Sequence, residues 1–259
     1  MDLGIKGKVA MVAAGSKGIG LATAKMLAEE GCLVSICGRT EETLAQAAVE
    51  IGEETRTYVA DVGNADDLAW WVDQTIQDLG TPSILVTNTG GPPAGKLGDM
   101  TDEQWQAGFE NTLMSVIRLT RLVQPKMAEQ GWGRIVHVTS YVAKEPSPLL
   151  PISSTLRAGL MGLVRLQAAE YGPQGVTVNC VLPGSTMTDR QFHLAEIRSN
   201  ATGMSPEQVL EESAQAVALR RIADPREIAS AIAFLCSEPG GYISGVNLLV
   251  DGGLTRGLG

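Results

Sequence analysis

The sequence predicts an α/β protein in which one doubly wound parallel sheet of about seven strands carries helices on both faces. Two observations lead to this prediction. Short apolar runs alternate with longer amphipathic segments along all 259 residues. The runs are mostly rich in Val and Ile, as strands buried on both faces should be. The alternation of strand and helix implies right-handed crossovers, and therefore a sheet of the Rossmann type.

The predicted strands are apolar runs at 9–14, 33–37, 57–60, 83–88, 134–140, 176–182 and 246–250. The segments between them have the pattern of helices, for example 18–31, 41–52, 65–80 and 158–172. Each of these four ends at a Gly, which is a common helix stop. No repeat or low-complexity linker divides the chain, so we expect one dinucleotide-binding domain spanning residues 1–259.

The segment 188–219 breaks the strand–helix rhythm. It is polar and then helical, with Ser205 as the expected N-cap and Pro206 at the first helical position. Such an excursion before the last strand predicts a lid on the substrate side. A plain pair of surface helices is the alternative.

Composition excludes several functions. Twenty basic and 29 acidic residues give a net charge of −9, and no basic cluster indicates nucleic-acid binding. Four cysteines without a CxxC pair, together with only two histidines, predict neither a zinc site nor a disulfide framework. We find no signal peptide and no apolar run that could span a membrane, and therefore expect a cytoplasmic protein.

A Gly-rich loop joins the first predicted strand to the first predicted helix. Glycine allows a tight turn and a close approach to a pyrophosphate, and the helix that follows offers free N–H groups. This context predicts dinucleotide binding, although a tight turn without a ligand is the alternative. The loop residues are Gly15, Ser16, Lys17, Gly18, Ile19 and Gly20.

The end of the second strand indicates which dinucleotide binds. An acidic residue there would bind the adenosine ribose, whereas a basic residue would accept a 2′-phosphate. Gly38 stands where the acid would be, Arg39 follows it, and Lys17 adds a second cation. The pattern favours NADP(H) over NAD(H), unless both cations are merely solvated surface residues.

Several motifs occur together in an order that resembles the short-chain dehydrogenase/reductase family, including its 3-oxoacyl-ACP-reductase-like proteins. They are "AGSKGIG", Asp61 with Val62, "TNTG" with Asn88 and Gly90, "VNCVLPGSTMT" with Pro183, Gly184 and Thr188, and "YISGVNLLVDGG". The resemblance covers nearly the whole chain. It implies that Asp61 and Val62 lie beside the adenine, and that Pro183, Gly184 and Thr188 lie against the nicotinamide.

The catalytic residues of that family are only partly kept. The resemblance assigns the family Ser to Ser140, but Ser153 stands where Tyr is expected and Arg157 where Lys is expected. The family Asn falls on Thr112, and Asn111 is one position away, which a register shift would explain. Three of the four identities therefore differ from the family pattern.

The missing Tyr matters because hydride transfer to a carbonyl requires a proton donor. An aliphatic alcohol is a far weaker acid than a phenol, so Ser153 cannot replace Tyr as that donor. It can hold a water or a bound oxygen, or simply cap the helix that begins near Pro151. Arg157, one turn later, can keep the family Lys role of binding the nicotinamide ribose, but it is a poor proton relay.

Tyr141 and Lys144 follow Ser140 in the chain, and both are candidates to take over the missing chemistry. Lys144 would serve as an acid or an oxyanion stabiliser, and Tyr141 would supply a phenol. The alternative is that both are surface or substrate-loop residues. His137 lies between valines in a predicted strand, which favours a core histidine over a general base.

The function expected from these features is NADP(H)-dependent hydride transfer between a small-molecule carbonyl and its alcohol, at an atypical site. The rival is a catalytically impaired nucleotide-binding homologue that acts as a sensor or scaffold. In a third reading, the substrate or a bound water supplies the proton. The resemblance also implies a homodimer or homotetramer, with helices at 102–129 and 152–171 as candidate interfaces.

Overall fold

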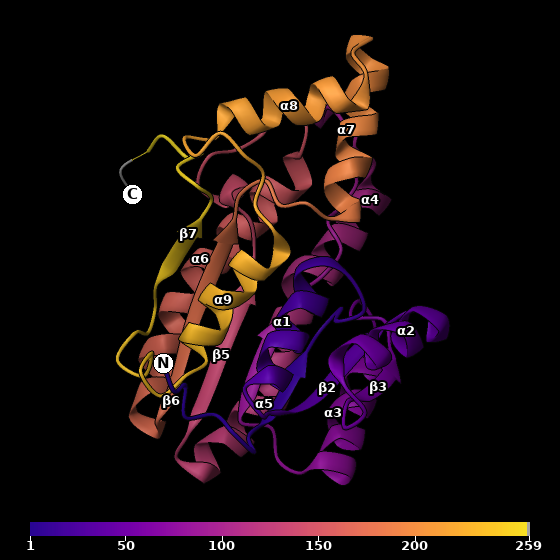
Figure 1. Cartoon of the computed structure of the whole chain (residues 1–259). Helices are drawn as coiled ribbons and strands as arrows, with labels where there is room; N and C mark the ends of the chain where they lie inside the picture. The colour runs from indigo at the N-terminus through magenta and orange to yellow at the C-terminus, as the bar shows by residue number, and fades with distance from the viewer. Residues whose placement is uncertain (258–259) are drawn as a thin grey trace.

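A computed structural model describes residues 1–257 and contains a seven-stranded parallel sheet of the predicted kind (Figure 1). Every predicted apolar run forms a strand, with ends that differ from the prediction by at most two residues. The strands are β1 (Val9–Val12), β2 (Leu33–Gly38), β3 (Arg56–Val59), β4 (Ile84–Thr87), β5 (Gly133–Val138), β6 (Val176–Pro183) and β7 (Asn247–Val250). Their order across the sheet is β3-β2-β1-β4-β5-β6-β7, and all adjacent pairs are parallel.

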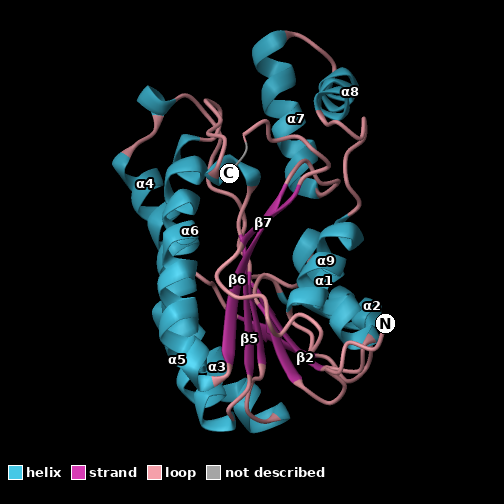
Figure 2. Cartoon of the chain, turned by 90° about the vertical axis from the view of Figure 1, so that its left-hand side faces the viewer, coloured by secondary structure: helices cyan, strands magenta, loops and turns pink. Residues whose placement is uncertain are grey.

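Helices cover both faces of the sheet, as Figure 2 shows with the sheet seen nearly edge-on. One face carries α1 (Gly18–Glu29), α2 (Glu41–Ile51) and α9 (Pro225–Leu235). The other carries α3 (Ala65–Leu79), α5 (Ser115–Gln130) and α6 (Pro151–Tyr171). A shorter helix, α4 (Asp102–Phe109), continues into α5 through a π-helical turn at Glu110–Met114.

Two apolar cores fill the spaces between the sheet and its helices. Leu27, Leu44 and Ile232 pack on one face, and Trp71 and Leu119 pack on the other. These side chains are almost completely removed from water. The sheet is therefore held from both sides, which fixes the positions of the strand ends that carry the site.

His137 is a core residue on β5, as predicted. Its Nδ1 lies 2.8 Å from Thr87 Oγ1, and its Nε2 lies 2.9 Å from Gln167 Oε1. Since an amide oxygen only accepts, Nε2 carries the proton and Nδ1 accepts from the Thr87 hydroxyl. Burial lowers the pKa of His137 to about 4, while the hydrogen bond with Gln167 opposes the shift only in part. The ring is therefore neutral at neutral pH.

The four cysteines are free and buried. Burial raises the pKa of Cys37 to about 12, so that its thiol is inert at neutral pH. Among residues 1–257, no group of His, Cys, Asp and Glu is arranged to hold a metal ion. Within the same range, no helix combines the length and apolar character needed to cross a membrane.

The sheet has a topological switch between β1 and β4. From β1 the chain runs outward through β2 to β3 and then returns to place β4 on the other side of β1. Ligands of open α/β sheets bind at such a point, outside the carboxyl ends of the strands. The fold therefore places the Gly-rich loop, which follows β1, at the expected position.

The predicted lid segment forms two helices, α7 (Asp189–Thr202) and α8 (Pro206–Ala216). They stand beyond the carboxyl ends of the strands, at the top of Figure 1. Ser205 caps α8 in a capping box with Gln208, and Pro206 is its first residue, as predicted. Helix pairing is thus confirmed, while motion of this pair stays a prediction.

Candidate active site

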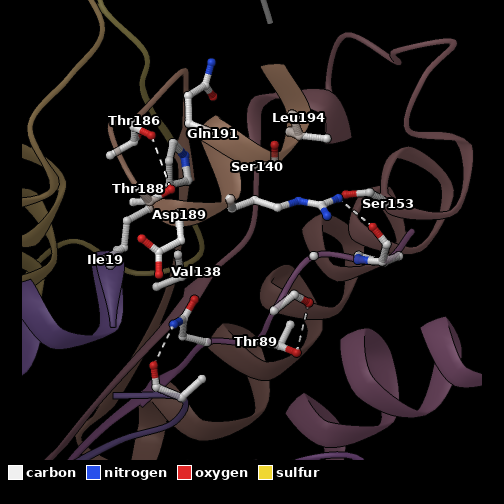
Figure 3. Close-up of a pocket in the computed structure, with 18 of the residues that line it drawn as sticks. Ile19, Thr89, Val138, Ser140, Ser153, Thr186, Thr188, Asp189, Gln191 and Leu194 are labelled. Atoms are coloured by element: carbon white, nitrogen blue, oxygen red, sulfur yellow. Dashed lines mark hydrogen bonds between the residues drawn. The ribbon is translucent and has the colours of Figure 1, made fainter. Parts of the chain in front are cut away.

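A cleft of about 920 Å³ lies at the carboxyl ends of the central strands. Its walls come from the Gly-rich loop, the ends of β2, β4, β5 and β6, the start of α6, and the helices α7 and α8. Figure 3 shows Ile19, Thr188 and Asp189 on one side of this cleft and Ser153 and Leu194 on the other. The cleft therefore connects the predicted cofactor loop with the altered catalytic positions.

The structure requires glycine at positions 18 and 20 of the first loop for two different physical reasons. Gly18 has φ +54°, a left-handed conformation that favours glycine. Gly20 allows α1 to pack on the end of β1, because a Cβ there would lie 2.3 Å from the carbonyl oxygen of Ala14. No side chain caps the first turn of α1, whose N-cap is Lys17. Its N–H groups are thus available to an anion in the cleft.

The end of β2 is crowded for any side chain at position 38. A Cβ at Gly38 would lie 3.1 Å from Ser16 Oγ and 3.3 Å from Leu44. Arg39, the next residue, is exposed and lines the cleft. On the opposite side of the loop, Lys17 Nζ lies 3.4 Å from the carboxylate of Asp189 on α7.

The cleft gathers most of the residues expected to bind the cofactor. Gly15 and Gly20 are the exceptions, since they are buried in packing contacts behind the wall. Those in the wall are Ser16, Lys17, Gly18, Ile19, Arg39, Asp61, Val62, Asn88, Gly90, Arg157, Pro183, Gly184 and Thr188.

Ser140 and Ser153 both line the cleft. Ser140 follows β5 and is the N-cap of a short 3-10 helix at Tyr141–Ala143. The capping alternative for Ser153 is wrong: Leu150 is the N-cap of α6, Pro151 is its first residue, and Ser153 lies inside the first turn. Ser154 does not cap the helix either, since its hydroxyl accepts from the amide of Ser147. Ser153 is therefore free to face the cleft.

Arg157 is a buried cation at the floor of the cleft. Its side chain is only 5% exposed, and its Nη1 donates to the carbonyl oxygen of Val138 at 3.1 Å. Among residues 1–257 its Nε has no hydrogen-bond partner, and no Asp or Glu pairs with it. Burial lowers the pKa of Arg157 to about 10, so the guanidinium remains charged at neutral pH.

The π-helical turn decides which of two neighbouring residues faces the cleft. Asn111 lines the cleft, whereas Thr112 is fully buried with an unpaired hydroxyl among the described residues. The Asn111 amide donates to Ala107 O at 2.8 Å. It also packs on Gly63, whose Cβ would lie 2.7 Å from Asn111 Oδ1. Asn111 thus stands beside the residues expected at the adenine, and its catalytic role stays a prediction.

The two takeover candidates are placed differently. Tyr141 lines the cleft, but Lys144 is not part of its wall. Burial and the charge of Glu145 raise the pKa of Tyr141, the opposite of the shift that would activate a phenol. The catalytic role of Lys144 stays a prediction, with no support from this arrangement.

Arg190 is a site residue that the sequence analysis missed. It lines the cleft from the first turn of α7, and its Nη2 donates to the carbonyl oxygen of Pro92 at 2.5 Å. Its Nε approaches Gly91 so closely that a Cβ there would lie only 2.8 Å away. The only sequence signal was its position two residues after Thr188, within the predicted lid.

Comparisons with known proteins agree with this fold. Residues 13–255 match the family model described as Enoyl-(Acyl carrier protein) reductase. The chain is 35% identical to 3-oxoacyl-(acyl-carrier-protein) reductase FabG of Vibrio cholerae, over 97% of this chain and 99% of the relative.

Solved structures of NADPH complexes are also similar. L-Sorbose reductase from Gluconobacter frateurii, complexed with NADPH and L-sorbose, has a TM-score of 0.94 and 32% identity, with full coverage of both chains. An actinorhodin polyketide ketoreductase with NADPH has a TM-score of 0.92 and 30% identity, covering 95% of this chain and 97% of that one. The chain belongs to the short-chain dehydrogenase/reductase family of oxidoreductases.

Proposed function

We propose that the protein is an NADP(H)-dependent oxidoreductase that interconverts a small-molecule carbonyl compound and its alcohol at an atypical catalytic site. The observation that carries the proposal is the single cleft that joins the Gly-rich loop to Ser140, Ser153 and Arg157. A non-catalytic nucleotide binder would need the first part of this cleft but not the second.

The loop residues fit a dinucleotide. The uncapped first turn of α1 offers N–H groups to a pyrophosphate, and Gly18 leaves the backbone open to it. The crowded Gly38 and the exposed Arg39 support the preference for a 2′-phosphate. Lys17 adds a second cation, which also forms an ion pair with Asp189.

When bound, NADPH would supply the hydride. The Ser140 hydroxyl would donate a hydrogen bond to the carbonyl oxygen, and the fixed charge of Arg157 would stabilise the negative charge that develops there. Arg157 would also hold the nicotinamide ribose through its remaining N–H groups. Since Ser153 is too weak an acid to give the proton, its role would be to hold a water that does so.

A second candidate function has a specific basis. Ser153 and Arg157 replace the proton donor and the lysine of the family, which favours a sensor or scaffold that binds NADP(H) without turnover.

The family resemblance also supports a homodimer or homotetramer whose interfaces are formed by helices α4 to α6. We further propose a cytoplasmic location.

A combined binding and turnover experiment separates the two functions. NADPH binding would be titrated by fluorescence, and NADPH oxidation would be followed by stopped-flow absorbance across aldehydes, ketones, oxo acids and acyl thioesters. The oxidoreductase proposal predicts binding together with oxidation on at least one substrate class, and Ser140→Ala should slow that oxidation. Tight binding without oxidation on every class would instead establish the sensor or scaffold function.

A further inference from the structure

The cleft has a charge opposite to that of the protein. The chain has a net charge of −9, yet five basic and two acidic side chains line the cleft. The acids are Asp61 and Asp189. The bases are Lys17, Arg39, Arg157, Arg190 and Arg198. Such a focused positive field attracts an anion.

The cofactor phosphates account for only part of this charge. Lys17 and Arg39 lie at the Gly-rich loop, where the phosphates are expected. Arg198 is neutralised by Glu212, with its Nη2 2.5 Å from that carboxylate. Arg190 remains, and so does the charge of Arg157, which a contact with the uncharged nicotinamide ribose would not neutralise. Arg157 contacts Val138 at the end of β5, and Arg190 contacts Pro92, which follows β4.

Neither of these two arginines forms an ion pair with an acid in residues 1–257. Each instead donates to one backbone carbonyl, Arg157 to Val138 and Arg190 to Pro92. A guanidinium has five N–H donors, so most of their hydrogen-bonding capacity is unused. Burying a charge without a partner is costly, and a 95%-buried arginine of this kind is unusual unless a ligand completes it.

The two charges also act on each other. The positive charge of Arg190 is one of the causes that lower the pKa of Arg157, after burial. Both side chains line the same cleft as Ser140 and Ser153. An anion bound between the two guanidinium groups would relieve their repulsion and supply the missing partner to both.

We propose that this end of the cleft binds a carboxylate of the substrate through Arg190 and Arg157, so that the protein acts on oxo acids in preference to neutral ketones. The planar fork of a guanidinium matches a carboxylate. The inference rests on the proposed oxidoreductase function. In the reaction, the carbonyl carbon gains a hydride from NADPH and the oxygen gains a proton from water. The products are a hydroxy acid, NADP⁺ and the hydroxide left by that water, which amounts to the uptake of one proton from the solution.

Binding to the protein loaded with NADP⁺ tests this proposal without turnover. Calorimetric titration would compare acetoacetate with methyl acetoacetate, which differ in charge, and dihydroxyacetone phosphate with dihydroxyacetone. We expect acetoacetate to bind at least about 30-fold more tightly than its ester, because only the carboxylate accepts charge-assisted hydrogen bonds from the two guanidinium groups. Equal affinity within the first pair would overturn the proposal. A preference confined to the phosphate pair would overturn the assignment of a carboxylate.

Variants of α7 supply the matched control. Arg190→Gln should reduce the preference for acetoacetate at least about tenfold, and Arg190→Lys should restore part of it by returning the charge. Arg198→Gln, on the same helix and also in the cleft wall, should change it less than about twofold because Arg198 is already paired. Equal losses in Arg190→Gln and Arg198→Gln would contradict a specific site. Melting curves would show that each variant is folded.

The two proposals fail in different ways. A retained preference for acetoacetate without any NADPH oxidation would overturn the oxidoreductase function and leave the anion site in place. Oxidation of NADPH by neutral ketones, without any preference for acids, would overturn the anion site alone.

Discussion

The two ends of the cleft differ in how tightly the fold constrains them. At the Gly-rich loop, glycines 15, 18 and 20 are required by packing or by backbone conformation. At the other end, Ser153 and Arg157 occupy positions where the family pattern has Tyr and Lys. Both side chains are buried in the first two turns of α6, whose N-cap is Leu150 and whose first residue is Pro151, so neither of them caps the helix. Packing and backbone conformation thus constrain the proposed cofactor loop, whereas the proposed chemistry depends on side chains that differ from the family pattern.

The largest expected effect is at the constrained end. Gly20→Val would place a branched side chain against the Ala14 carbonyl oxygen, which is backbone and cannot move aside. We expect a loss of stability of about 3 kcal/mol and loss of measurable NADPH binding. Calorimetric unfolding and NADPH titration would check this. Gly98→Ala is the control, because nothing lies within 4 Å of its Cβ. An intact Gly20→Val protein would contradict the claim that packing constrains the loop.

At the replaceable end, Arg157→Gln should affect rate more than folding. Under the proposed mechanism this charge stabilises the developing oxyanion, so its removal should slow NADPH oxidation by about 10²–10³-fold. Arg165→Gln, at an exposed position of the same helix outside the cleft wall, should leave the rate nearly unchanged, since among residues 1–257 the Arg165 side chain donates only to Gly245 O. Single-turnover absorbance would measure both variants. A similar rate in Arg157→Gln and the wild type would show that the cation has no part in the reaction.

A pH experiment tests how strongly the fold excludes a proton from His137 on the strand beneath the site. His137 has a pKa lowered from 6.5 to about 4. Between these values the unfolded chain binds a proton that the folded protein excludes. Stability should therefore rise with pH across this window, by roughly 3 kcal/mol for this residue. Chemical denaturation at several pH values would measure the slope.

Substitution identifies the source of that slope. His137→Gln should remove most of it, whereas His193→Gln, at an exposed position on α7, should preserve it. An unchanged slope in His137→Gln would show that another group controls acid unfolding.

The smallest expected effect is at the cofactor phosphate. Arg39→Asp should weaken NADPH by about tenfold or more while changing NADH much less, since only NADPH carries a 2′-phosphate. Arg56→Asp, an exposed arginine outside the cleft wall, is the control for a general charge effect. Fluorescence titration would measure the affinity of each variant for NADPH and for NADH. Equal weakening of the two would contradict the assignment of Arg39 to the phosphate.

The sequence predicted the fold better than the site. Apolar runs and Gly stops located all seven strands, because buried parallel strands and helix ends have strong local signals. Ser205 was recognised as a cap for the same reason. These features depend on residues close together in the chain.

The site depends on contacts that are distant in sequence. The π-helical turn that separates Asn111 from Thr112 has no signal in the residue pattern. Arg190 is identified as a site residue by its contact with Pro92, which is distant from it in the sequence. The sequence allowed a capping role for Ser153 because Pro151 marks a helix start. In the structure Pro151 is the first residue of α6, but its N-cap is Leu150.

Transfer of deuterium tests the central claim most directly, namely that an altered site still carries out hydride transfer. The protein would be given NADPH deuterated at the transferable C4 position together with an oxo acid, and the product would be analysed by mass spectrometry. We predict a hydroxy acid with one deuterium on the former carbonyl carbon, and little of it from Arg157→Gln. Tight NADPH binding without any deuterated alcohol from the carbonyl panel would contradict the claim.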